Sequence, residues 1–389
     1  MDFFKNRKFK ETIVLISSIF LGMAFGIFLV LILKAIVNTY LSPVDEFMRT
    51  IFVVVTIVFG FFVELILHEM GHMVFGFLSG YEFSSFRILS FMIIRKDGKF
   101  SFRRFSLPGT AGQCLMIPPM KEGNDFPVVL YNFGGVIFNA VTGILCFVIA
   151  YCMKDAKITS LIWSAVGLIA IIMAVTNGIP IHSSIDNDGL NAMVLKKNAD
   201  ARRCLKVLLN VNSDLIQGKR MKDVPETYFT GDVSSLETTL GCSVAVQSCA
   251  REIDKHDFVM AQEKIEYLLE NANEMNFIDR SSITCELIWM LLLQGKKEEA
   301  SSYMTKNIHS FIKSMRSFPS IVRLQYAWAR YYDQQEVDAE QHKKHFYKLL
   351  NTYPYAGEVK GEKELFEITE KGEWNGTQSV SEDGNANNE

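Results

Sequence analysis

Long apolar stretches dominate the first half of the chain and are missing from the second. Four of them, at about residues 12–37, 48–78, 128–153 and 158–181, are long enough to cross a bilayer, which takes about 20 helical residues. From about residue 196 onward, apolar and polar residues mix as they do in amphipathic helices. The pattern predicts an all-α polytopic membrane protein with four transmembrane helices, followed by a helical domain outside the membrane.

The segment between the second and third apolar stretches has a different pattern, in which apolar and polar positions alternate. Lys96-Asp97-Gly98-Lys99 has the composition of a tight hairpin turn, and Phe100-Ser101-Phe102 continues the alternation beyond it. Because lipid does not tolerate a bare strand edge, such a hairpin must be covered by protein or line a wet cavity. We expect a membrane-associated β-hairpin with an edge that can pair with an extended peptide.

The polar half predicts paired helices, beginning with an amphipathic stretch at about 201–215. Leu291-Leu292-Leu293-Gln294-Gly295, followed by Glu298-Glu299-Ala300, resembles the turn between the helices of a tetratricopeptide repeat. The repeat periods are irregular, and a generic helical bundle fits the pattern equally well. We expect a transmembrane domain at 1–199, a helical TPR-like domain at 200–375 and a disordered polar tail at 376–389.

Charge narrows the choice of compartment and partners. The net charge of -3 gives no basic excess that would indicate nucleic acid, and none of the seven Cys forms a Cys-x-x-Cys pair. Lys and Arg concentrate at the N-terminus and in the segment 79–125, which places both on the cytoplasmic side. We expect an integral membrane protein, in the plasma membrane of a bacterium, with both termini in the cytoplasm.

The second apolar stretch contains ionisable residues that suggest chemistry. His68 and His72 are four residues apart, so they share one helix face and can bind one metal ion together. Two imidazoles suit Zn²⁺, and Glu69 can take a proton from a water molecule that the metal activates. A charge at the bilayer centre costs roughly 2.5–3.5 kcal/mol, so such residues are tolerated where they face a site. Glu64, one turn earlier, either supports an imidazole as a hydrogen-bond partner or contacts another helix.

A catalytic zinc ion takes a third protein ligand and leaves one position open. The end of the fourth apolar stretch reads Asn177-Gly178-Ile179-Pro180 and then Asp186-Asn187-Asp188-Gly189. Pro180 ends the helix, and Gly189 permits an unusual backbone conformation that lets Asp188 turn back toward the membrane. A plain Asn-Asp-Gly turn accounts for the same residues equally well.

Together these motifs resemble the site-2 protease family of intramembrane zinc metalloproteases. The resemblance covers about residues 48–191 and lacks the PDZ domain that many bacterial members contain. It implies one zinc ion per chain, bound by His68, His72 and Asp188, with Glu69 activating water. The spacing before Asp188 is longer than in the common family pattern, which leaves Asp186 open as the third ligand.

The resemblance also implies substrate contacts. Gly135-Val136-Ile137-Phe138-Asn139 is similar to the family's Gly-x-x-x-Asn motif, so Asn139 is expected to contact the scissile region or the reacting oxygen. An interhelical hydrogen bond is the alternative role for Asn139. Asn177 is expected to contact the substrate as well, and Gly112-Gln113-Cys114-Leu115-Met116 is expected to be the strand edge with which the substrate pairs.

These expectations describe an intramembrane endopeptidase that cuts transmembrane or signal-peptide segments within the lipid bilayer, with a protein partner on the helical domain. One alternative is a membrane adaptor that keeps the zinc site without proteolysis, which the intact Glu69 disfavours. Another is a membrane metalloprotease of a different class with a Glu as third ligand. The third and fourth apolar stretches contain no Glu, which disfavours this class.

Overall fold

The computed structural model describes residues 45–119, 126–181, 186–229 and 236–374, together with the isolated positions 27 and 31. Apart from positions 27 and 31, the predicted first span lies outside these residues, as does the predicted polar tail. The chain divides into two compact units. One, called the membrane unit below, consists of the residues up to Ile88 and Ala111–Ala199. Its elements are α2 (Glu46–Leu78), β1 (Glu82–Ile88), β4 (Gly112–Ile117), α3 (Val129–Cys152), α4 (Lys157–Gly178) and α5 (Asp188–Lys197).

The other unit, called the helical unit below, consists of Leu89–Thr110 and the residues from Asp200 onward. Its elements are β2 (Phe91–Lys96), β3 (Lys99–Arg104), α6 (Ala199–Gln217), η1 (Met221–Asp223), η2 (Glu226–Tyr228), α7 (Thr239–Asp254), α8 (Phe258–Asn271), α9 (Phe277–Leu293), α10 (Lys297–Tyr303), α11 (Lys306–Ser314), α12 (Pro319–Ala327), η4 (Trp328–Tyr332), α13 (Glu336–Leu350) and α14 (Ala356–Lys371).

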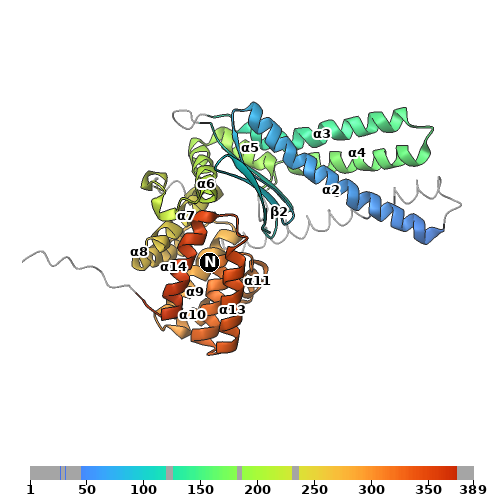
Figure 1. The fold of residues 1–389 in the computed structure, drawn as a ribbon. Coiled ribbons are helices and arrows are strands. Elements are labelled where there is room, and N and C mark those ends of the chain that lie inside the picture. Colours follow the sequence, from blue (N-terminus) through green and yellow to red (C-terminus); the bar gives the residue numbers. More distant parts are fainter. Residues whose placement is uncertain are drawn as a thin grey trace, which may run out of the picture. The chain divides into compact units, whose positions relative to one another are not determined.

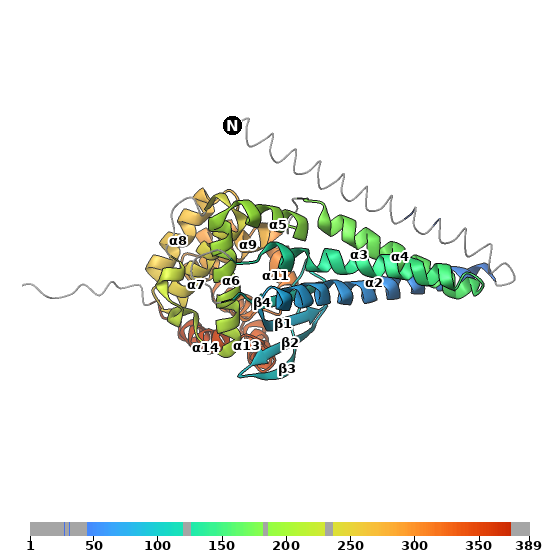
Figure 2. The ribbon, with the colours of Figure 1, turned by 90° about the horizontal axis from the view of Figure 1, so that it is seen from above.

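Within the described residues, α2, α3 and α4 are long and apolar enough to cross a membrane, and they run side by side (Figures 1 and 2). Outward side chains such as Val58 and Ile144 are apolar and exposed, as expected of a surface that faces lipid. Three of the four predicted spans are therefore confirmed as candidates. The last ends at Gly178 rather than near 181, because Pro180 favours extended backbone at Ile179, whose ψ is 124°.

β1 and β4 form the antiparallel strand pair of the membrane unit. Glu82 lies opposite Ile117 at one end, and Ile88 lies opposite Gly112 at the other. β4 also packs along α2, where a Cβ atom on Gly76 would lie 2.2 Å from the sulfur of Met116. The pair therefore lies directly against the helix that carries the His-Glu-x-x-His motif.

β2 and β3 form the predicted hairpin. Lys96 pairs with Lys99, and the two residues between them, Asp97 and Gly98, have φ values of 50° and 75°. Positive φ at both central positions defines the type I′ turn that matches the twist of the strands, so the predicted turn is confirmed. The hairpin groups with the helical unit, whereas the sequence had assigned all of residues 1–199 to one domain.

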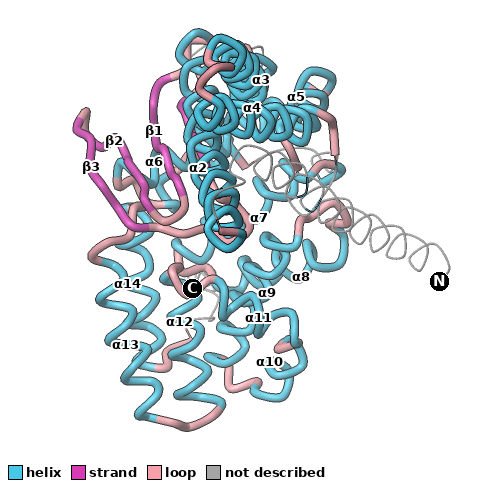
Figure 3. Tube along the Cα trace, turned by 90° about the vertical axis from the view of Figure 1, so that its right-hand side faces the viewer, coloured by secondary structure: helices cyan, strands magenta, loops and turns pink. Residues whose placement is uncertain are grey.

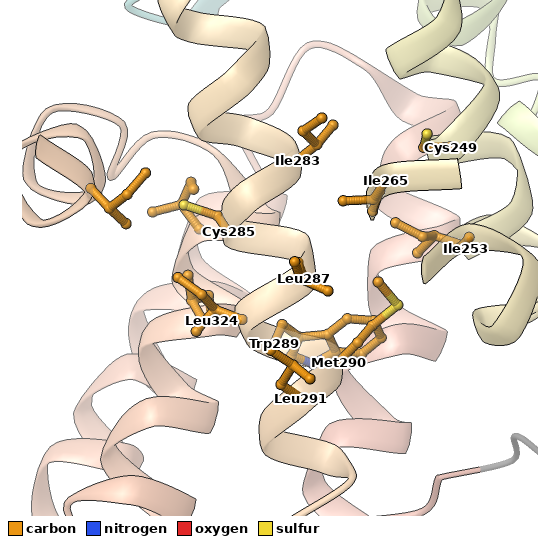
Figure 4. Close-up of a cluster of buried hydrophobic side chains, with 14 of the residues drawn as sticks. Cys249, Ile253, Ile265, Ile283, Cys285, Leu287, Trp289, Met290, Leu291 and Leu324 are labelled. Carbon is orange, nitrogen blue, oxygen red and sulfur yellow. The ribbon is translucent and has the colours of Figure 1, made fainter. Parts of the chain in front are cut away.

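The helical unit is organised around α9, which packs against α7, α8, α10, α11 and α12 (Figure 3). Trp289 and Leu287 of α9 are fully buried, with Ile265 of α8 and Leu324 of α12 nearby (Figure 4). The predicted amphipathic stretch is α6, and the predicted turn joins α9 to α10 through Gly295 with φ 76°. The TPR-like assignment stays a prediction.

Candidate metal centre

Helix α2 carries four polar side chains on its buried face. Glu64, His68, Glu69 and His72 are between 1 and 8 % exposed. Residues four apart lie above one another on a helix, so Glu64, His68 and His72 form one row. This local periodicity places the side chains, and their burial inside a candidate membrane span means that protein groups must satisfy them.

Asp188, the first residue of α5, joins the two His in a group that can hold a metal ion. The Nε2 atoms of His68 and His72 lie 3.2 Å apart, and Asp188 Oδ2 lies 3.1 Å and 3.4 Å from them. Ligands about 2.0–2.1 Å from a tetrahedral zinc ion are about 3.3 Å from one another. The three atoms therefore have the spacing of a zinc site with its fourth position open.

A further property of Asp188 fits a cation. Its Oδ2 atom is buried and has no hydrogen-bond partner among the described residues. A cation bound between this oxygen and the two imidazole nitrogens would satisfy it. Asp186, the alternative ligand, does not belong to the group found among the described residues.

A residue of α3 holds the Nδ1 atom of His68 by a hydrogen bond. This Nδ1 lies 2.6 Å from Asn139 Oδ1, and Asn139 Nδ2 donates to the Glu64 carboxylate at 2.8 Å and to the Glu64 carbonyl at 3.0 Å. Because Nδ2 is the donor in both of these bonds, Asn139 Oδ1 must accept a hydrogen bond from His68 Nδ1–H. Thr142 Oγ1 also donates to the Glu64 carboxylate, at 3.0 Å. This network leaves His68 Nε2 free for a metal ion.

His72 is oriented in the same way by a backbone group. Its Nδ1 donates to the carbonyl oxygen of Tyr131 at 2.9 Å, so Nε2 again faces the metal position. The Tyr131 hydroxyl donates to the carbonyl of Cys114 on β4 at 2.7 Å. Tyr131 therefore connects the environment of a candidate ligand to the strand that borders the site.

Glu69 lies against the start of β4. A Cβ atom added to Gly112 would lie 2.4 Å from Glu69 Oε1, so any larger residue at this position would displace the Glu69 side chain. The fully buried guanidinium of Arg87 on β1 lies 3.5 Å from the Gly112 carbonyl and brings positive charge near Glu69. β4 pairs with β1 along one edge, and no described strand pairs with the other.

Asn177 Nδ2 donates to the carbonyl of Met173 in its own helix at 2.9 Å, and the substrate contact of Asn177 stays a prediction. One residue lies differently from what the sequence suggested. Gly189 has no positive φ; it is needed instead because a Cβ atom there would lie 2.2 Å from the Gly178 carbonyl oxygen. The glycine permits close approach of α5 to the end of α4.

Sequence reasoning missed Tyr131, Thr142 and Asn187. Tyr131 acts through its backbone carbonyl, which leaves no signal in residue identity. Thr142 lies one helical turn after Asn139, a spacing that would have marked both as neighbours on one face of α3. Asn187 was visible only as part of a turn.

Comparison with known proteins gives one match. Residues 56–324, well over half of the chain, match the family model described as Peptidase family M50. The match includes α2 from its third turn, both strand pairs, α3, α4, α5 and much of the helical unit. Comparisons with curated proteins and with solved structures gave no match.

Proposed function

Because the chain belongs to peptidase family M50, whose members are zinc-dependent metallopeptidases, we propose that it is an intramembrane endopeptidase. Its substrates are transmembrane or signal-peptide segments. The observation that carries the proposal is the triangle of His68, His72 and Asp188 on helices of the membrane unit. A soluble peptidase has no reason to place these groups within an apolar span.

The residues divide the chemistry among them. His68, His72 and Asp188 would hold one zinc ion, which would polarise the scissile carbonyl and acidify the attacking water. Glu69 takes the proton of that water and delivers it to the leaving nitrogen. Asn139, supported by Glu64, keeps His68 in the tautomer that presents Nε2. This role for Asn139 replaces direct substrate contact, because both ends of its amide are already engaged.

The edge of β4 with which no described strand pairs supports binding of an extended substrate. A peptide that adds to an exposed edge is held by main-chain hydrogen bonds, which do not depend on its sequence. Gly112 at the start of β4 lies against Glu69, so a paired segment passes close to the catalytic carboxylate. A transmembrane helix must unwind to bind in this way, and strand pairing offsets the lost helical hydrogen bonds.

The wider setting is part of the proposal. Three candidate spans and the family membership make this an integral membrane protein. The excess of Lys and Arg on one side supports a cytoplasmic location for the termini and the helical unit, in the plasma membrane of a bacterium. The helical unit offers a surface for a protein partner.

The test uses the purified full chain in proteoliposomes with a panel of signal-peptide and single-span segments. We expect wild type to contain one zinc ion per chain and to cleave members of the panel. Glu69→Gln keeps the zinc and loses about 10²–10⁴-fold in cleavage rate, the usual contribution of a general base. Met70→Leu, at the next position, serves as the matched control and cleaves like wild type.

If wild type contains zinc and Glu69→Gln cleaves as fast as wild type, Glu69 has no role in the mechanism. Absence of zinc from the active wild-type protein would remove the metal centre. A zinc-loaded protein that cleaves nothing, and whose Glu69→Gln form behaves like wild type in cells, would favour the adaptor function.

A further inference from the structure

The connection between α4 and α5 decides where Asp188 lies. α4 ends at Gly178, and Asp188 is the first residue of α5, so the third ligand depends on how the start of one helix is fixed to the end of another. Pro180 leaves a defect at this junction. It has no N–H, so the carbonyl of Thr176, four residues earlier, cannot make its usual helical hydrogen bond.

Asn187 repairs this defect with its side-chain amide. Its Nδ2 donates to the carbonyls of Thr176 at 2.8 Å and of Ile179 at 2.6 Å. Its Oδ1 accepts from the backbone N–H of Ile181 at 3.2 Å and of Leu190 at 3.0 Å. One amide therefore bonds the last turn of α4, the extended residues after it and the first turn of α5.

We infer that Asn187 is the positioning residue for Asp188. The inference rests on the proposed function, in which Asp188 binds zinc. An N-cap residue usually serves only its own helix, whereas here the same side chain also ties α5 to the broken end of α4. Because Asp188 follows directly, any change in this bond network moves its carboxylate relative to His68 and His72.

The chemistry of the side chain limits the substitutes. The Nδ2 atom of Asn187 donates to two carbonyls, and its Oδ1 atom accepts from two N–H groups. The position therefore needs a donor and an acceptor on one short side chain. Asp keeps the acceptor that caps α5 but has no donor for α4. Ser caps α5 and is too short to reach all four groups. Ligand positions in metal sites tolerate only a few tenths of an ångström, so a loosened junction weakens metal binding.

The test compares Asn187→Asp and Asn187→Ser with Asn191→Ala in the purified full-length protein. Asn191 lies on the same helix and makes a single side-chain bond, to the Asp186 carbonyl at 3.2 Å. Zinc affinity is measured by competition with a chelator. The kcat and KM values are measured with a membrane segment that wild type cleaves, and folding is measured by thermal unfolding in detergent. We expect both Asn187 variants to lose about 10–100-fold in zinc affinity, as for other residues that orient ligands.

In the Asn187 variants, kcat recovers when zinc is raised and KM stays near the wild-type value, while Asn191→Ala binds zinc as wild type does. Wild-type zinc affinity in either Asn187 variant would overturn the inference. Loss of the thermal transition in both would overturn it too, because the amide would then hold the fold rather than the ligand. Failure of wild type to bind zinc would instead refute the proposed function.

Discussion

At the residue scale, both candidate imidazole ligands present Nε2 to the metal position. They do so because a hydrogen bond holds Nδ1, the other nitrogen of each ring. His68 is fixed by the Asn139 side chain and His72 by the Tyr131 carbonyl, both on α3. A metal ion that needs two Nε2 ligands therefore meets them already oriented, with little rotamer entropy left to lose. Helix α3 thus contributes no ligand but sets the geometry of two.

Replacing Asn139 distinguishes ligand support from substrate contact. Asn139→Ala removes the acceptor for His68 Nδ1 and leaves the Glu64 carboxylate without its buried donor. We expect zinc affinity to fall about 10–100-fold in a chelator competition assay. Asn177→Ala, which loses a bond only to its own helix, keeps wild-type zinc affinity. A raised KM with unchanged zinc affinity in Asn139→Ala would instead support the substrate-contact role that the sequence suggested.

Sequence spacing predicted that Glu64, His68 and His72 share one face of α2, since they are related by the period of one helix. Asp188 on α5 and Asn139 on α3 were candidates only through the family resemblance, because spacing alone does not say how separate helices pack. The choice between Asp186 and Asp188 depended on the path of the chain after Pro180, which is set by bonds from Asn187 to backbone groups. Backbone partners leave no pattern in side-chain identity.

At the scale of elements, glycines set how closely the membrane helices approach. A Cβ atom on Gly71 would lie 2.4 Å from the Gly134 carbonyl oxygen, so Gly71→Ala forces α2 and α3 apart. We expect a loss of about 1–3 kcal/mol in unfolding free energy, measured by denaturation in mixed micelles, with weaker zinc binding. Gly60→Ala on the same helix meets the ends of the Ile169 and Val166 side chains, at 3.0 Å and 3.3 Å, and serves as the control. Equal stability of the two variants would contradict close backbone packing at Gly71.

The helical unit contains a pH-sensitive carboxyl on α14. Burial raises the pKa of Glu358 to about 7, although its carboxylate accepts a hydrogen bond from the Tyr353 hydroxyl at 2.8 Å. The folded state therefore binds a proton that the unfolded chain releases above pH 4.5, so stability falls as pH rises from about 4.5 to 7. The total loss is at most about 3 kcal/mol.

Glu358→Gln removes this titration. We expect the variant to match wild type at pH 4 and to melt at higher temperature at pH 8, as measured by thermal unfolding in detergent. Glu263→Gln, at an exposed position on α8, provides the control. It should leave the melting temperature unchanged at both pH 4 and pH 8. A wild-type pH dependence that persists unchanged in Glu358→Gln would assign the effect to another group.

At the scale of the whole molecule, the order of the chain conceals which parts fold together. Alternation and the Asp97-Gly98 turn predicted the hairpin correctly, because both signals are local. Its grouping with helices that begin a hundred residues later could not be predicted, since it depends on side chains buried between distant segments. Met92 and Ile94 are each 1 % exposed, in a core that they share with Val211 and other residues of α6.

Phe105, just after β3, is the strongest point of this attachment. It is 4 % exposed and contacts the rings of Phe318, Tyr353 and Tyr355 edge-on, with centroids 5.2–5.8 Å away. Phe105→Ala leaves a cavity among these rings, and such a change costs about 3–5 kcal/mol. We expect a lower melting temperature for the helical unit and faster amide hydrogen exchange in α6 and α14 of the full-length protein.

Phe102→Ala supplies the matched comparison, because Phe102 lies on the same hairpin and is 77 % exposed. It should leave hydrogen exchange in α6 unchanged. If both variants behave like wild type, the hairpin is not part of the helical core. If only Phe105→Ala loosens α6, the helical unit depends for its stability on a segment whose two ends continue directly into β1 and β4. The chain passes between the membrane unit and the helical unit at three points, and two of these lie at the end of β1 and just before β4.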